Sequence, residues 1–278
     1  MTMAEQEPEL DMTRSQVFGE VAELYDAARP GYADALAGDV LAYAALDGRT
    51  AVEIGAGTGK ATRSFAALGT PLLCIEPDLR MAEVLRRNTA GFPQVRVRAG
   101  RFEDWQPDGR RFGLVYAATS WHWVDPERRW DLVHDALAPG GAVALFWNPH
   151  GTLDPRLQAA LVEVDRRYGL DRTPHGVSAS DYGETPGDWA GVREWPEEEC
   201  RRDGRFTDLR AVRYRQEQYY DTERYLGLLA SVSGYRVLPA ERRERILAET
   251  AEVLDAHGGG IAMDHLTDLF LARVRPAR

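Results

Sequence analysis

Three glycines at alternate positions follow a short apolar run, and they constrain this chain more than any other feature of its sequence. The run covers 51–54, and the glycines are Gly55, Gly57 and Gly59. Glycine suits a tight turn between a strand and a helix because it adopts positive φ without steric cost and lets a ligand approach the backbone. The pattern therefore predicts a nucleotide-binding turn at the end of a strand.

The spacing of these glycines differs from that of two common nucleotide-binding motifs. Dinucleotide turns read G-x-G-x-x-G and nucleoside triphosphate loops read G-x-x-x-x-G-K-[ST], whereas the order here is G-x-G-x-G. Glu53 stands two residues before the first glycine, where a carboxylate would repel a pyrophosphate but suit a cationic ligand. These residues favour S-adenosylmethionine as cofactor over a nicotinamide dinucleotide.

From residue 50 onward, short apolar runs alternate with segments that have an amphipathic helical pattern. This alternation is typical of βαβ units, whose crossover helices build a parallel sheet in a doubly wound α/β fold. The helix that begins at Pro126 is expected to end near Pro139-Gly140-Gly141. The predicted strands are 51–54, 72–75, 95–99, 113–118 and 142–147.

The composition limits the class of partner. The formal net charge of the 278-residue chain is −10 at pH 7, which disfavours a surface that tracks nucleic-acid phosphates. The two cysteines, Cys74 and Cys200, fit neither a metal-ligand spacing nor a disulfide framework. No window approaches the roughly 18 to 20 apolar residues of a membrane span. We expect a cytoplasmic protein that binds no nucleic acid, membrane or metal, and its oligomeric state stays open.

Five motifs occur in order along residues 17–148. They are Phe18-Gly19-x-x-Ala22-x-x-Tyr25-x-x-x-Arg29-Pro30-x-Tyr32, Glu53-Ile54-Gly55-Ala56-Gly57-Thr58-Gly59, Glu76-Pro77-Asp78-x-x-Met81, Trp121-His122-Trp123 and Pro139-Gly140-Gly141. With these motifs the chain resembles the class I S-adenosylmethionine-dependent methyltransferases, and within them the small-molecule enzymes of the trans-aconitate and ubiquinone type. The resemblance implies a Rossmann-like sheet of seven strands, mostly parallel with an antiparallel last strand, plus an insertion or lid.

Beyond Asn148 the alternation fades. We expect a helix over 155–168, a polar tract over 173–199, a strand over 206–219, helices over 222–231 and 239–257, and a last strand over 266–274. Together with the resemblance, this pattern predicts four parts. They are an N-terminal helical cofactor lid (1–48), a cofactor-binding core (49–148), an insertion or substrate lid (149–204) and a segment that completes the sheet (205–278).

The resemblance assigns roles to residues around the cofactor. Glu53 should meet the methionine ammonium directly or through water, or else only cap the next turn. Glu76 ends the second strand about 20 residues after the turn, where an acid can accept both ribose hydroxyls. Tyr25 and Arg29 lie in the lid, where they would hold the methionine carboxylate, although Arg29 could instead be a surface cation.

Other residues are expected near the adenine. Pro77 and Met81 would pack against it, although Met81 could equally be an ordinary core residue. Relatives often place an acid after the third strand, where this chain has Arg101, so backbone groups near Phe102 or the carboxylate of Glu103 are expected to read the adenine instead. The predicted cofactor contacts also include Ala56, Thr58 and Ala118.

His122, just after the fourth predicted strand, is the candidate catalytic residue. It would act as a general base for a neutral hydroxyl or a protonated amine, whereas an ionised carboxylate needs no base. The alternative is a histidine that only positions the cofactor or lines the pocket. Trp121, Trp123 and Trp147 could line an acceptor pocket or belong to the core.

The leading hypothesis is a methyltransferase that moves the methyl group of S-adenosylmethionine in line to an oxygen, nitrogen or carbon of a small molecule. The alternative is a biosynthetic enzyme of the same fold, such as a cyclase, that binds the cofactor without transferring its methyl group. Formation of S-adenosylhomocysteine during turnover distinguishes the two.

Overall fold

A computed structural model describes residues 22–170, 173–188 and 195–276 of the chain. These residues form two compact units, and each is described here by itself. The first, which we call the sheet unit, holds residues 31–149, 184–188, 195–214 and 266–276. The second, which we call the helical unit, holds residues 22–30, 150–170, 173–183 and 215–265.

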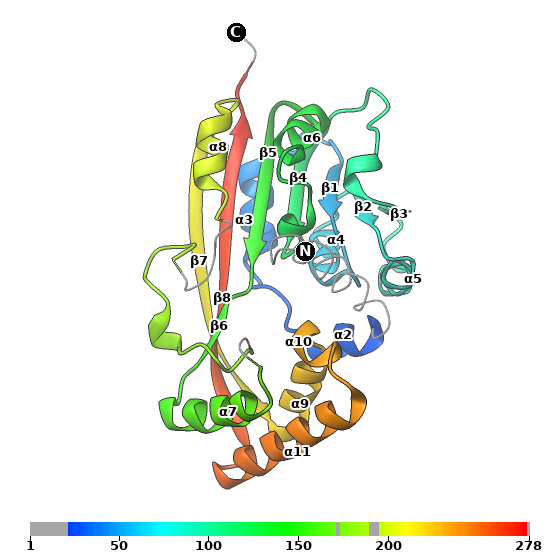
Figure 1. Ribbon diagram of the computed structural model, residues 1–278. Coiled ribbons are helices and arrows are strands. Elements are labelled where there is room, and N and C mark those ends of the chain that lie inside the picture. Colours follow the sequence, from blue (N-terminus) through cyan, green and yellow to red (C-terminus); the bar gives the residue numbers. More distant parts are fainter. Residues whose placement is uncertain (1–21, 171–172, 189–194, 277–278) are drawn as a thin grey trace, which may run out of the picture. The chain divides into compact units, whose positions relative to one another are not determined.

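Five parallel strands lie side by side in the order β3-β2-β1-β4-β5 (Figure 1). They are β1 (Ala51–Ile54), β2 (Leu72–Glu76), β3 (Val95–Ala99), β4 (Phe112–Ala118) and β5 (Leu137–Trp147). The chain winds outward from β1 to β3 on one side and returns to place β4 on the other side of β1. The carboxyl ends of β1 and β4, where the strand order reverses, are the usual place for a ligand in such a sheet.

The remaining strands run along the β5 edge. β8 (Gly260–Val274) is antiparallel to both β5 and β6 (His150–Thr152), and β7 (Phe206–Asp221) also pairs with β8. The predicted α/β fold with a mostly parallel sheet and an antiparallel last strand is confirmed. Within the described residues the sheet has eight strands, one more than the resemblance implied, because the short β6 adds to it.

Helix α6 (Arg129–Ala136) ends near Pro139-Gly140-Gly141, as predicted, but this segment itself lies within a strand, because β5 already begins at Leu137 rather than at residue 142. The pairing of β4 with β5 shifts register between Phe112 and Leu114, and Gly140 has a φ of 75°. A strand that contains an irregularity of this kind can accommodate proline and a left-handed glycine.

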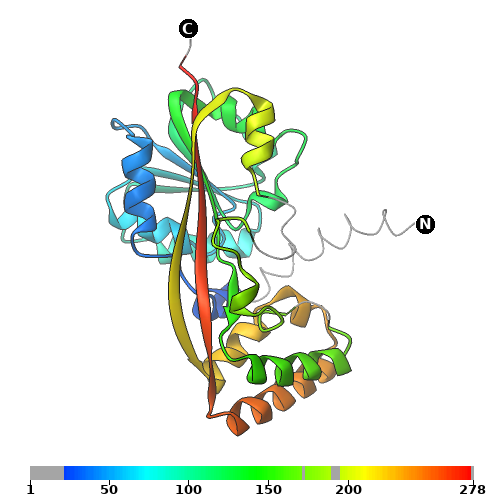
Figure 2. The same cartoon turned by 90° about the vertical axis from the view of Figure 1, so that its left-hand side faces the viewer.

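Helices cover both faces of the parallel strands. One face carries α3 (Leu36–Ala44), α4 (Lys60–Ala67) and α5 (Leu79–Asn88), and the other carries α6 and α8 (Glu197–Asp203). Figure 2 shows the blue α3 and the yellow α8 on opposite sides of the sheet. Two short 3-10 turns, η2 (Phe102–Asp104) and η3 (Trp121–Trp123), follow β3 and β4. Strands β1, β2, β4 and β5 are thus largely buried on both faces, which explains their mostly apolar sequences, whereas β3 at the edge of the sheet is partly exposed and carries two arginines.

The helical unit has its own apolar core, which includes Leu161, Leu229 and Ile246. Its helices are α2 (Ala22–Ala28), α7 (Pro155–Arg167), α9 (Thr222–Ala230), α10 (Ser233–Arg236) and α11 (Ala240–Ala256), with the 3-10 turn η4 (Ala179–Asp181). Helices α7 and α11 share this core, although the sequence places them in different predicted parts; the four-part division stays a prediction. In the part of the chain that the structure describes, no helix is both long enough and apolar enough to cross a membrane.

Candidate cofactor site

The glycine turn has the backbone conformation expected from its sequence. Gly55, Gly57 and Gly59 have φ values of 64°, 57° and 92°, all in the left-handed region. Residues with a Cβ rarely adopt this region, so glycine is the residue suited to each position. The turn leads from β1 at Ile54 into α4, whose N-cap is Gly59.

The surroundings of the three glycines differ. A Cβ on Gly55 would lie 2.6 Å from Ser120 Cβ, and a Cβ on Gly59 would lie 2.6 Å from Leu85 Cδ1. A Cβ on Gly57 would meet no atom of the described residues within 4 Å. Packing therefore opposes a side chain at Gly55, and a side chain at Gly59 would require the end of Leu85 to move, whereas the described residues leave space beside Gly57 that a ligand could occupy.

Glu76 is bound to this turn. Its carboxylate accepts hydrogen bonds from the amides of Gly57 at 2.7 Å and Asp78 at 2.9 Å. Burial raises the pKa of the Glu76 carboxyl to about 7, although these two amides lower it. Glu76 ends β2, which is adjacent to β1, and this arrangement brings two of the predicted site features together.

Glu53 lies on β1, directly before the glycine turn, and its side chain is buried. It is 1% exposed, and its carboxylate accepts hydrogen bonds from Thr62 Oγ1 at 2.6 Å, Tyr116 OH at 2.8 Å and Cys74 Sγ at 3.7 Å. Burial raises its pKa to about 7, against the lowering effect of these donors. The structure thus gives Glu53 a supporting position within the sheet and against α4. Its contact with a ligand ammonium, directly or through water, stays a prediction.

The sequence reasoning did not predict the partners of Glu53. Strand register places Glu53 beside Cys74 on β2 and beside Tyr116 on β4. Each of these is a polar or polarisable group within a largely apolar strand. Three such residues at the same level of three adjacent strands indicate a buried hydrogen-bonded cluster, but this can be inferred only when the strand order is known.

The residues predicted near the adenine lie in different environments. Met81 is buried at the start of α5, where the carboxylate of Asp78 caps the helix, and Pro77 is exposed. Phe102 is buried, with its ring centroid 5.8 Å from that of Trp105. Of these, Pro77 has the surface that a ligand could contact without any rearrangement.

Glu103 is engaged by protein groups. Its carboxylate lies 3.1 Å from the Arg101 guanidinium and accepts a 3.0 Å hydrogen bond from the amide of Asp125. These contacts connect η2 to the loop that precedes α6. The predicted contact between Glu103 and an adenine stays a prediction, since a carboxylate retains further lone pairs for a second donor.

The segment after β4 lies next to the glycine turn. Ala118 is the last residue of β4, and the Ser120 side chain donates a hydrogen bond to the carbonyl of Ile54. His122, in η3, is partly buried, and its ring centroid lies 4.6 Å from that of Trp123, which is 37% exposed. The structure therefore places the candidate base at the carboxyl end of β4, the strand adjacent to β1.

Thr58 and Ala56 are buried parts of the turn itself. Thr58 is 1% exposed, and its carbonyl accepts a 2.9 Å hydrogen bond from the Asn88 side chain. Ala56 is 6% exposed and belongs to the core on the α4 face. Both residues would contribute backbone groups rather than side chains to a bound ligand.

The two residues of the predicted lid belong to the helical unit. The side chain of Tyr25 lies outside the described residues. Arg29 Nε donates a 3.1 Å hydrogen bond to Ser231 Oγ, within the same unit. The roles of Tyr25 and Arg29 in holding a methionine carboxylate stay predictions.

Comparison with known proteins finds similarity to methyltransferases. Residues 51–141 match the family model described as "Methyltransferase domain". An uncharacterized methyltransferase of Mycobacterium tuberculosis (strain H37Rv) is 29% identical over 265 residues, which cover 92% of this chain and 94% of the relative. Another, from Schizosaccharomyces pombe, is 25% identical over 209 residues, with 74% and 73% covered.

Two solved structures share the fold. One, provisionally described as a type II methyltransferase from Anaeromyxobacter dehalogenans, aligns with a TM-score of 0.61 at 23% identity and covers 90% of this chain and 99% of that chain. The YcgJ protein from Bacillus subtilis aligns with a TM-score of 0.51 at 16% identity, with 87% and 98% covered.

Proposed function

We propose that this chain, a member of the class I S-adenosylmethionine-dependent methyltransferases, transfers a methyl group from that cofactor to an oxygen, nitrogen or carbon nucleophile of a small molecule. The match to the methyltransferase family model and to methyltransferase relatives confirms the family and the enzyme class that the sequence predicted. The observation that carries the proposal is the contact of Glu76 with the amide of Gly57, at the carboxyl ends of β2 and β1.

The residues of the sheet unit fit the cofactor. Gly57 offers open space on its Cβ side, so a ligand could approach its backbone. The Glu76 carboxylate uses two of its roughly four acceptor positions for backbone amides and has others left for a pair of ribose hydroxyls. Pro77 would lie against the adenine, and the buried carboxylate of Glu53 would support the turn from beneath and place negative charge below a cationic ligand.

When bound, S-adenosylmethionine supplies a sulfonium methyl group that is open to in-line attack by a nucleophile. Most of the required catalysis can then come from orientation of the acceptor, which is the task of the protein. We assign His122 to the acceptor side, where its imidazole would accept a proton from a hydroxyl as the new bond forms, or from an ammonium group before its nitrogen lone pair attacks. An ionised carboxylate acceptor would use His122 for positioning only.

The acceptor is proposed to be a small molecule rather than a nucleic acid, and the protein to act in the cytoplasm. The net charge of −10 supports the choice of a small molecule over a nucleic acid, because binding to nucleic-acid phosphates depends mainly on clustered cations. The trans-aconitate and ubiquinone types of relative suggest two acceptor classes to test first: polycarboxylates, and phenols or quinols.

Detection of S-adenosylhomocysteine tests the proposal. The purified protein would be incubated with S-adenosylmethionine and with each member of a set of carboxylate, phenol and amine acceptors. We expect acceptor-dependent release of S-adenosylhomocysteine with one of these classes. Acceptor consumption with no S-adenosylhomocysteine released would instead support an enzyme that binds the cofactor without transferring its methyl group.

A further inference from the structure

A buried arginine lies against the turn that carries His122. Arg129 begins α6 and is 4% exposed. Its guanidinium carbon lies 5.0 Å from the centroid of the Trp121 ring, and Nη1 makes a long, 3.4 Å hydrogen bond to the Trp121 carbonyl. Trp121 immediately precedes His122 in η3. The same guanidinium thus contacts both the side chain and the backbone of the residue next to the candidate base.

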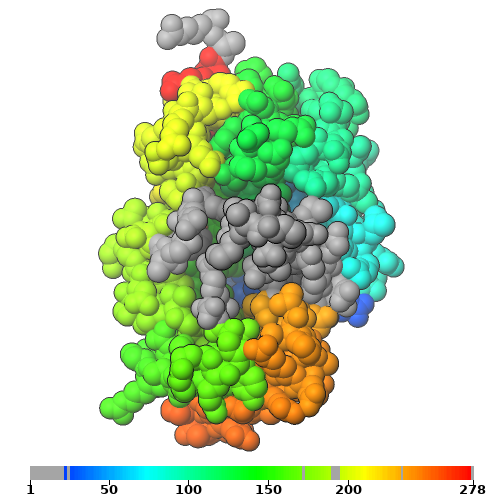
Figure 3. Space-filling model, in the orientation of Figure 1, coloured from blue at the N-terminus to red at the C-terminus, as the bar shows by residue number. Residues whose placement is uncertain are grey.

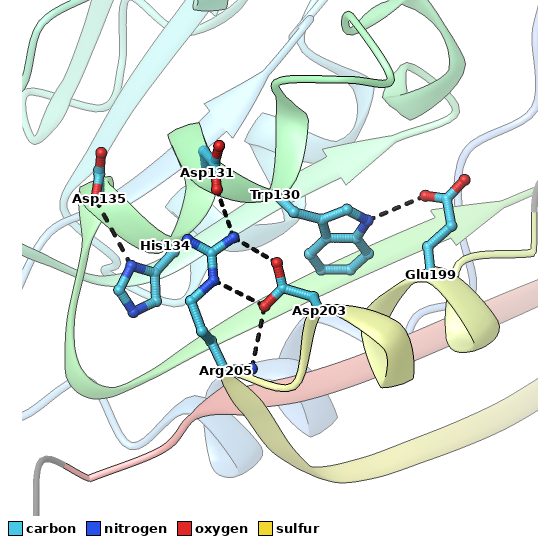
Figure 4. Close-up of polar contacts among 7 residues, drawn as sticks. All are labelled: Trp130, Asp131, His134, Asp135, Glu199, Asp203 and Arg205. Atoms are coloured by element: carbon cyan, nitrogen blue, oxygen red, sulfur yellow. Dashed lines mark hydrogen bonds and ion pairs between the residues drawn. The ribbon is translucent and has the colours of Figure 1, made fainter.

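A carboxylate from α8 holds this guanidinium in place. Nη2 of Arg129 lies 2.7 Å from both oxygens of Glu199. The Trp130 indole donates a 3.0 Å hydrogen bond to the same carboxylate, as Figure 4 shows. Figure 3 shows the yellow α8 residues beside the green residues of this part of the sheet unit. Among the described residues, the Nε atom of Arg129 has no hydrogen-bond partner, and Glu199 forms the ion pair of this buried cation.

A second arginine connects the same two elements without contacting η3. Arg205 pairs with Asp131 of α6 at 2.6 Å and with Asp203 of α8 (Figure 4). The His134 ring lies on this side of α6, near Asp135 and 6.2 Å from the ring centroid of Phe206. Both arginines therefore connect α6 to α8, but the Arg129 side chain is 5% exposed and the Arg205 side chain is 36% exposed, so the Arg205 link is the more solvent-screened one. His122 follows Trp121 in the chain, and His134 lies on the Arg205 side of α6.

We propose that Arg129, held by Glu199, is a positioning residue that sets the orientation of His122 through Trp121. A planar guanidinium can stack on an indole and at the same time donate hydrogen bonds from its edge to a carboxylate. A lysine ammonium has no planar face with which to stack. Through this contact, the segment that contains α8 fixes the turn that presents the candidate base. The role of Arg129 in catalysis rests on the proposed function, whereas its contacts with Trp121 and Glu199 do not depend on that function.

Two charge-conserving variants test the proposal. Arg129→Lys keeps the positive charge but removes the stacking and the two-oxygen contact, and Arg205→Lys makes the same chemical change at the other link. The chain has six histidines, so labelling at Cε1 gives a small set of NMR resonances. The His122 resonance is assigned from His122→Ala, and the melting temperature of each variant is measured alongside.

We expect Arg129→Lys to shift or broaden the His122 resonance, and Arg205→Lys to move the His134 resonance while His122 stays in place. An unmoved His122 resonance in Arg129→Lys, or an equal movement in both variants, would overturn the proposal. If Arg129→Lys does not fold, Glu199→Gln with Asp131→Asn as its control gives the same comparison, since each removes one carboxylate charge.

Binding of S-adenosylhomocysteine separates this inference from the proposed function. We expect calorimetric affinity for this probe to change less than about twofold in Arg129→Lys, because Arg129 touches none of the proposed cofactor residues. A loss of affinity larger than in Arg205→Lys would assign Arg129 to the cofactor site and overturn the positioning role. If the wild-type protein fails to bind the probe, the proposed function falls, while the His122 shift still stands or fails by itself.

Discussion

The amide of Gly57 donates a 2.7 Å hydrogen bond to the carboxylate of Glu76. This contact joins the turn after β1 to the end of β2. Groups held in place by such protein contacts lose less conformational entropy when they bind a ligand. The Gly57 and Glu76 pair is therefore the part of the structure on which the cofactor assignment depends most.

Glu76→Ala is expected to weaken S-adenosylhomocysteine binding by more than tenfold, or about 1.4 kcal/mol, because a charge-assisted acceptor for the ribose is lost. Calorimetric titration of the variant measures this. Glu83→Ala, which removes an exposed carboxylate of α5, is the matched control and should bind as the wild type does. Equal affinity in the two variants would remove Glu76 from the site.

Alanine at Gly57 and at Gly55 should have different effects. Both substitutions place a Cβ at left-handed φ, at a cost of about 1 to 2 kcal/mol in the free energy of unfolding. Gly55→Ala adds overpacking against Ser120, worth about 1 to 3 kcal/mol. Gly57→Ala should instead lower the affinity for the cofactor by more than its loss of folding stability can explain. Urea denaturation and calorimetry on both variants check this, and a Gly57→Ala protein with full affinity would contradict it.

The buried carboxyl of Glu53 predicts a pH dependence of stability. Its pKa is raised from 4.5 to about 7, chiefly by burial, so the folded state binds more protons than the unfolded state between these values. Stability from this group is therefore fully present below pH 4.5 and is lost as the pH rises through about 7. This difference corresponds to on the order of 3 kcal/mol.

Glu53→Gln tests this prediction, because glutamine cannot ionise. Its free energy of unfolding, measured by urea denaturation from pH 5 to pH 8, should decline less with rising pH than that of the wild type. Glu163→Gln, which changes an exposed carboxylate of α7, is the control and should keep the wild-type slope. A Glu53→Gln slope equal to that of the wild type would show that burial does not raise the pKa of Glu53 in solution.

His122→Ala should lower turnover with a smaller effect on cofactor affinity. The reason is that His122 lies after β4, on the acceptor side of the proposed site, rather than in the glycine turn. With an identified acceptor, the rate of S-adenosylhomocysteine formation and its calorimetric affinity are measured in parallel. If affinity collapses while turnover of the loaded enzyme holds, His122 is a cofactor ligand instead.

A buried ion pair at the β7 and β8 edge predicts a large loss of stability. Arg213 forms two 2.6 Å contacts with Asp268, whose side chain is fully buried. Arg213→Met should lower the free energy of unfolding by about 3 to 5 kcal/mol, because it leaves a buried charge without this partner. Arg166→Met breaks an exposed pair with Glu163 and should cost less than about 1 kcal/mol. Similar losses in urea denaturation would contradict the prediction.

Much of the sheet could be predicted from the sequence because its signals are local. The strand Val95–Ala99 has the predicted bounds, and the positive φ of Gly55, Gly57 and Gly59 follows from their spacing in a tight turn. Each of these features depends on residues within one short segment. The order of the motifs along the chain was then enough to identify the family.

Features that depend on contacts between distant segments could not be predicted. The carboxylate of Glu53 turns toward Thr62 and Tyr116, and the direction of a strand side chain depends on which face neighbouring helices cover. The pairing of Arg129 with Glu199 joins residues 70 positions apart, and no local pattern marks it. The strand at Pro139-Gly140-Gly141 was missed because proline and glycine occur both just after a helix and in an irregular strand.

Calorimetric titration of the wild-type protein with S-adenosylmethionine, S-adenosylhomocysteine and NAD tests the central claim most directly. We predict micromolar binding of the two sulfur compounds and no binding of NAD, because the site pairs one open glycine with a ribose-binding acid and has no third glycine for a pyrophosphate. Binding of NAD, or of none of the three, would contradict the assignment of the glycine turn.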